Sequence, residues 1–135
     1  MSQENVDAVR RGLEAFNSGD IERVLDMAHT YFEAIVPPEL SAEPDTYRGH
    51  DGLRRYFESF QDAMEDIRFE PERFIDVGED VVTVVRLTAR GRHTAIPVEQ
   101  RIAQVWSMSE GKAVQVRTFA TLKRALAAAG LPEEA

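Results

Sequence analysis

The hydrophobic pattern of this chain changes its period once, near residue 67. Up to that point apolar residues mostly recur three or four positions apart, as on one face of a helix, whereas beyond it they recur at every second position, as on one face of a strand. The clearest helical stripe consists of Leu53, Tyr56, Phe57, Phe60 and Met64. Helices followed by successive hairpins predict an α+β fold, with the helices packed on one face of an antiparallel sheet.

Turn residues divide the chain into the expected elements. Gly19 suits the end of a first helix, Pro37 stops an early strand, and Pro71 inside a later strand suggests a sheet edge or a bulge. We expect helices at 2–17, 21–28, 50–64 and 121–129, strands at 31–36, 67–77, 81–92, 98–109 and 113–119, and a loop at 39–50.

The strands 81–92 and 98–109 are longer than the roughly 5–6 residues that are usual. Long strands twist and curl, and a curled sheet closed by an aromatic-rich helix makes a cone that can hold a small molecule. We therefore predict a cone of a strongly curved antiparallel sheet, with three N-terminal helices packed on its concave face and a short C-terminal helix.

The composition limits the classes of function. The 135 residues fit one domain spanning 1–135, and the absence of cysteine excludes disulfides, thiolate zinc sites and cysteine nucleophiles. A net charge of −8 repels phosphate backbones, so we expect no nucleic-acid partner. No apolar run approaches the roughly 20 residues that span a bilayer and no secretory signal is visible, so we expect no membrane partner and a cytoplasmic protein. The three histidines lack ligand spacing, and we expect no metal and no cofactor.

The hairpin around Gly111 can pair in two registers. A two-residue loop pairs Val105 with Val116, whereas a three-residue loop with Gly111 at a bulge pairs Trp106 with Val114. We favour the second register because it separates apolar from polar residues better. It places on one face Ile102, Trp106, Met108, Val114 and Val116.

Polar residues interrupt the faces that we expect to line the cone. Gln104 and Thr118 fall among the apolar residues of the hairpin, Arg86 and Thr88 share a face with two valines of their strand, and Glu33 shares one with an aromatic residue. Buried polar groups need partners, so we expect these five side chains to converge inside the cone.

Five stretches of the chain resemble the SnoaL-like branch of the nuclear-transport-factor-2-like superfamily. They are EAFNSGD at 14–20, YRGHDGLRRYF at 47–57, VVTVVRLTARGR at 81–92, VWSMSEGKAVQVRTF at 105–119 and LKRALAAAGL at 122–131. The resemblance covers nearly the whole chain and implies an α+β cone that is commonly dimeric. Members include polyketide cyclases, ketosteroid isomerase, limonene-epoxide hydrolase, dehydratases and non-catalytic binders, so the resemblance does not fix an activity.

The positions that carry acid–base chemistry in such proteins differ in this chain. Cyclases and epoxide hydrolases of this kind place an aspartate on the last strand, where this chain has Thr118, and epoxide hydrolases use an Arg-x-Asp pair where this chain has Arg86-Leu87-Thr88. A threonine hydroxyl cannot act as a base near pH 7. Glu33 is then the candidate base, with Arg86 stabilising developing negative charge. The alternative is that Glu33 and Arg86 form a structural ion pair or that Glu33 lies at the rim.

These observations lead to one leading function and two alternatives. We expect a SnoaL-like protein that binds a small, largely apolar organic molecule in its cone, and whether it is an enzyme stays open. Catalysis, if present, is proton transfer in an isomerisation, cyclisation or dehydration, with Glu33 and Arg86 as the catalytic pair. The alternatives are a non-catalytic binding or interaction module and a dimerisation scaffold without a ligand. The side chains expected to contact the ligand are Phe16, Tyr31, Tyr56, Phe60, Thr88, Gln104, Trp106, Val116 and Thr118.

The outer face of the predicted sheet is too apolar to lie wholly in water, so we expect a homodimer through this face. The residues expected there are Val85, Leu87, Ala103, Val105 and Phe119.

Overall fold

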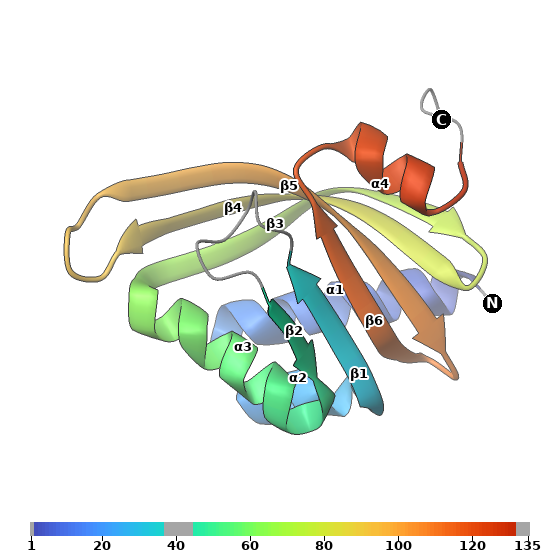
Figure 1. The fold of residues 1–135 in the computed structure, drawn as a ribbon, viewed down its shortest axis with the longest axis horizontal. Coiled ribbons are helices and arrows are strands. Elements are labelled where there is room, and N and C mark those ends of the chain that lie inside the picture. The colour runs from blue at the N-terminus through green and yellow to red at the C-terminus, as the bar shows by residue number, and fades with distance from the viewer. Residues whose placement is uncertain (1, 37–44, 132–135) are drawn as a thin grey trace.

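The computed structural model describes residues 2–36 and 45–131 of the chain. Most of the helices come first and four consecutive strands follow, as expected of an α+β fold (Figure 1). In chain order the elements are α1 (Ser2–Ser18), α2 (Ile21–Asp26), β1 (Ala28–Val36), β2 (Asp45–Arg48), α3 (Gly49–Ala63), β3 (Met64–Val77), β4 (Asp80–Gly91), β5 (Pro97–Ser109), β6 (Lys112–Phe119) and α4 (Leu122–Ala128). The prediction of a loop at 39–50 is wrong for its second half, because residues 45–48 form a strand and α3 begins at Gly49. Residues 37–44 lie outside the described part of the chain.

The strands form a single curved, unclosed sheet in the order β2-β1-β6-β5-β4-β3 (Figure 1). Neighbouring strands are antiparallel with one exception, since β1 runs parallel to β6 and places Ala34 opposite Val116. The predicted antiparallel cone is therefore confirmed except for this pair.

Helices cover both faces of the sheet. The helices α1, α2 and α3 lie on the concave face, where Val9, Leu13 and Phe57 pack with Phe69 and Val85 of the sheet. The short α4 lies on the convex face (Figure 1), where its residues Ala125 and Leu126 cover three sheet residues in a second core. Those three residues are Val82, Ala103 and Val105. The middle of the sheet is consequently buried on both faces, which explains the continuous run of β-branched residues in β4.

Two of the five residues predicted for the outer face lie on the other face. Val85 and Leu87 belong to the core on the concave face, while Ala103 and Val105 lie beneath α4. Phe119 is half-buried next to that second core. Burial on both faces of β4 removed the alternation by which its two sides could be told apart.

The β5–β6 hairpin combines features of both predicted registers. Glu110 and Gly111 have φ values of 52° and 78°, as expected for the two central residues of a tight two-residue turn. A register shift follows a few residues beyond the turn and places Trp106 opposite Val116. The predicted pairing of Trp106 with Val114 is therefore wrong, but Trp106 still shares its face with Val116, because a slip of two residues keeps every side chain on the same side.

The strand β3 lies at one edge of the sheet, and its pairing with β4 shifts register on both sides of a regular segment. Pro71 sits at the second shift, so the predicted edge and the predicted bulge are both confirmed. On the side of β3 that has no neighbouring strand, Asn17 of α1 makes two hydrogen bonds with the backbone of Phe69, and we call this pair of bonds the clasp. Asn17 Nδ2 donates to the Phe69 carbonyl oxygen at 2.9 Å, and the Phe69 amide nitrogen donates to Asn17 Oδ1 at 2.6 Å. The Asn17 amide thus takes the place that a further strand would fill at this residue.

Candidate functional site

A pocket of about 480 Å³ opens between α3 and the concave face of the sheet, and we call it the mouth pocket. This volume falls within the roughly 300–1,000 Å³ that is usual for small-molecule sites. Phe60, Leu87 and Ile102 contribute to its apolar wall. Its polar side chains are Tyr47, Tyr56, Ser59, Gln100 and Thr118.

A second cavity of about 40 Å³, the inner pocket, lies deeper between the helices and the sheet. Phe16, Phe32 and Leu53 contribute to its wall, with Gln104 as a polar residue. Tyr56 and Phe69 line both pockets, so the two pockets adjoin at these side chains. Because a cavity needs only about 10–15 Å³ of such volume to hold one water molecule, the inner pocket has room for a small chemical group of a few heavy atoms.

A small hydrogen-bonded cluster sits at the inner pocket. Trp106 Nε1 donates to Gln104 Oε1 at 3.1 Å, and Thr83 Oγ1 donates to the same oxygen at 3.3 Å. All three residues are buried. Such an enclosed and directional set of bonds holds the Gln104 side chain in one orientation.

Tyr56 borders both pockets with a side chain that ends in a hydroxyl group. Its ring packs edge-on against Phe60 at a centroid distance of 5.1 Å, and Phe16 lies 6.3 Å away. Burial raises the pKa of Tyr56 well above its ordinary value, and the neighbouring Tyr47 adds to the rise. The hydroxyl is therefore protonated at neutral pH and can both donate and accept a hydrogen bond.

Neither pocket has a charged side chain in its wall, as far as the described residues go. Within 2–36 and 45–131, no three histidine, aspartate or glutamate side chains gather where a metal ion could bind. No helix of this part of the chain has the length and apolar character needed to cross a bilayer. The described walls of the two pockets can therefore bind a molecule through apolar contacts and through hydrogen bonds with neutral groups.

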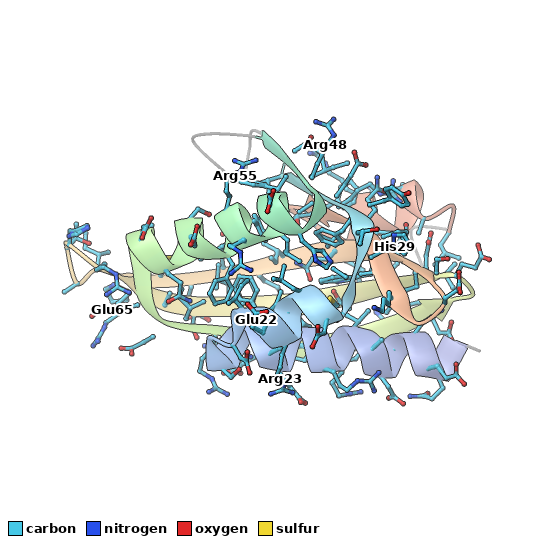
Figure 2. The ribbon with its side chains drawn as sticks, turned by 90° about the horizontal axis from the view of Figure 1, so that it is seen from below. Glu22, Arg23, His29, Arg48, Arg55 and Glu65 are labelled. Atoms are coloured by element: carbon cyan, nitrogen blue, oxygen red, sulfur yellow. The ribbon has the colours of Figure 1, made fainter. Side chains whose placement is uncertain are left out.

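Glu33 lies on the opposite side of β1 from the pockets. Phe32 and Ala34 are buried on the concave side, so Glu33 between them points to the outer side. Its carboxylate accepts hydrogen bonds from Arg48 Nε and Gln115 Nε2, each at 3.2 Å. Figure 2 shows Arg48 extending outward from the fold. The prediction that Glu33 lies in the cone is therefore wrong.

Arg86 also lies on the convex face, where Arg86 Nε donates to Glu99 Oε2 at 2.7 Å. Arg101 forms a second pair there, with 2.6 Å between its Nε and Glu72 Oε1. The arginine hydrogen bonds hold the pKa values of Glu72 and Glu99 below the usual carboxyl range. Glu33 and Arg86 thus have separate partners, and the predicted catalytic pair does not form.

A family model described as the SnoaL-like domain matches residues 9–116 of this chain. The chain belongs to the SnoaL-like family. No curated protein matches it.

Solved structures share the fold of this SnoaL-like domain. An NTF2-like protein from Burkholderia xenovorans LB400 is 27% identical, with a TM-score of 0.77 over 96% of this chain and 97% of that one. An NTF2-like protein of unknown function from Burkholderia pseudomallei K96243 is 22% identical, with a TM-score of 0.79 over 94% and 97%. TerC, co-crystallised with polyporic acid, is 22% identical, with a TM-score of 0.79 over 98% and 99%.

The pockets of the SnoaL-like domain bring together most of the residues that we expected to contact a ligand. Those in the wall of one or both pockets are Phe16, Tyr56, Phe60, Gln104, Trp106, Val116 and Thr118. Tyr31 does not belong to them, because it is 80% exposed on the outer side of β1 and stacks on His29. Thr88 is next to Leu87, which lines the mouth pocket, and therefore points to the convex face.

Several wall residues escaped the sequence analysis. Tyr47 comes from β2, a strand of four residues that is too short to show alternation. Leu87 was assigned to the outer face together with Val85. Gln100 and Ser59 are exposed polar residues of long amphipathic elements, and no pattern distinguishes them from other surface positions.

Proposed function

We propose that this SnoaL-like domain binds a small, largely apolar organic molecule in its cone and does so without acid–base catalysis by Glu33 and Arg86. The observation that carries the proposal is the mouth pocket, whose volume suits such a molecule and whose described wall is uncharged. The outward position of Glu33 and its bonds to Arg48 and Gln115 favour the binding function over the enzymatic one. TerC, which has this fold, was co-crystallised with an organic molecule, polyporic acid.

The proposal can be tested with N-phenyl-1-naphthylamine, a neutral apolar dye whose fluorescence rises when it leaves water. We expect the purified protein to bind this dye at one saturable site. Ser59→Trp adds an indole at the mouth pocket from an exposed position of α3, so it should weaken dye binding at least ~10-fold. Glu58→Trp places the same indole at the adjacent exposed position, which does not line either pocket, and should leave binding unchanged.

The dye is excited directly, so the added tryptophans do not contribute to the signal. Equal binding by the two variants would place the dye outside the mouth pocket and contradict the proposal. Failure of the wild-type protein to bind the dye would contradict it as well. Mass spectrometry of compounds released from freshly purified protein then identifies the class of the natural ligand.

A further inference from the structure

We propose that the side-chain amide of Gln104 recognises the ligand, by donating a hydrogen bond from Nε2 to a neutral oxygen acceptor at the narrow end of an otherwise apolar molecule. A ketone or a similar carbonyl compound has this chemistry. The inference rests on the proposed function, because it requires a molecule that enters the cone. It goes further by naming the donor atom and the class of chemical group that meets it.

The orientation of the Gln104 amide follows from its partners. An indole nitrogen can only donate, so the atom that lies 3.1 Å from Trp106 Nε1 must be the amide oxygen. The Thr83 hydroxyl points at the same oxygen from 3.3 Å. Since both bonds use Oε1, the nitrogen Nε2 faces away from Thr83 and Trp106.

The nitrogen of this amide has no hydrogen-bond partner among the described residues, although Gln104 is only 4% exposed. In the same part of the chain, Arg117 Nε is the one fully enclosed side-chain nitrogen or oxygen without a partner. Gln104 Nε2 is therefore not enclosed by protein, and the cavity that Gln104 lines is the inner pocket. A nearly buried donor without a protein partner prefers to meet an acceptor, and for this nitrogen that acceptor has to come from the inner pocket.

The inner pocket restricts which acceptor fits. With about 40 Å³ it admits a group of a few heavy atoms, and in our proposal the body of the molecule extends past Tyr56 and Phe69, which border both pockets, into the mouth pocket. A carboxylate would be buried against neutral groups with one or two donors, which does not compensate for the loss of its hydration. A carbonyl oxygen needs no counter-charge and accepts from one or two neutral donors, and Tyr56, which also lines the inner pocket, carries a second neutral donor.

Three probes with a common phenylethyl body separate the possibilities. They are 4-phenylbutan-2-one, its alkene isostere 2-methyl-4-phenylbut-1-ene, and 3-phenylpropanoate, which replaces the methyl group by a charged oxygen. Binding is followed by the fluorescence of Trp106, the single tryptophan of the chain, and by the side-chain amide signals of Gln104 in nitrogen–proton NMR spectra. We expect the ketone to bind ~10-fold more tightly than the alkene, the carboxylate to bind more weakly than the ketone, and a Gln104 amide proton to shift with the ketone.

Two variants complete the test. Gln104→Met keeps the length of the side chain without the donor and should abolish the preference for the ketone. Thr83→Val removes one bond to Oε1 while Trp106 still fixes the amide, so it should keep the preference.

Equal affinity of the wild-type protein for ketone and alkene, or a preference that survives in Gln104→Met, would overturn the inference and assign Nε2 to bound water. These results leave the proposed function intact as long as N-phenyl-1-naphthylamine still binds. Loss of dye binding by the wild-type protein contradicts the proposed function instead.

Discussion

Replacing Asn17 by alanine tests the clasp between α1 and the edge strand β3. The substitution removes both hydrogen bonds between the Asn17 amide and the Phe69 backbone. Phe69 is 4% exposed and packs against Phe16 and Phe60 at centroid distances of 5.0 and 5.6 Å, so water reaches its backbone poorly. The unpaired amide and carbonyl groups therefore cannot recover both bonds from solvent.

The expected loss of unfolding free energy is about 2 kcal/mol, from about 1 kcal/mol for each hydrogen bond. With an unfolding entropy of about 2.1 cal/mol/K per residue over 135 residues, this loss lowers Tm by about 7 °C. Urea titration followed by Trp106 fluorescence measures the free energy, because Trp106 is buried in the folded protein and becomes exposed on unfolding.

Asn5→Ala is a matched control on the same helix. Asn5 Nδ2 makes a single exposed bond of 3.2 Å to the Gly78 carbonyl, so its loss should cost less than about 0.5 kcal/mol. Should Asn17→Ala and Asn5→Ala destabilise the protein equally, the clasp at Phe69 contributes nothing beyond an ordinary surface bond and the reasoning fails.

Three further predictions concern titration and assembly. Because the pKa of Tyr56 is raised in the folded state, the unfolded state loses the phenol proton at a lower pH than the folded state, and the free energy of unfolding should fall above about pH 10. An alkaline spectrophotometric titration should show a late phenol step that is absent in Tyr56→Phe. Arg86 lowers the folded-state pKa of Glu99, so their pair stabilises the fold above the ordinary carboxyl pKa and this contribution vanishes as the pH falls through the lowered value. Urea titrations in low salt should thus find Glu99→Gln less stable than the wild type near about pH 7 and equal to it below about pH 3. The homodimer through the outer sheet face stays a prediction. Light scattering should give twice the chain mass of 15.2 kDa, and the exposed-face variant Tyr31→Asp should shift the measured mass towards that of the monomer. A wild-type protein that is monomeric at all concentrations would contradict this prediction.

The helices could be predicted closely because each has one apolar stripe. The apolar stripe of α3 from Leu53 to Phe60 predicted that three aromatic rings face the sheet. In the structure two of them, Tyr56 and Phe60, line the mouth pocket. The faces of β5 and β6 were also predicted, since Trp106 and Val116 share the concave side as expected. The register was not predictable from the turn alone, because the bulge lies beyond it.

The catalytic pair was misplaced for a physical reason. In β1, Tyr31 and Ile35 are apolar although they lie on the outer side with Glu33, so hydrophobicity does not reveal which side faces the core. In β4, α4 covers Val82 on the convex side while Val81 and Val85 pack in the concave core, so this part of the strand is apolar on both sides. Where helices pack on both faces of a strand, alternation no longer assigns its polar residues to a side.

The two ends of the sheet have a consequence for the protein in concentrated solution. An open strand edge acts as a template on which other chains can add strands, which is how many proteins start to aggregate. Three features interrupt that template at the β3 edge: the two register shifts, the missing N–H of Pro71, and the backbone groups of Phe69 that are already bonded to Asn17. At the opposite edge, the described strand β2 has only four residues. Within the described residues, both edges of the sheet thus offer only short runs of unpaired backbone groups, and the addition of strands from another copy is disfavoured while the fold is intact.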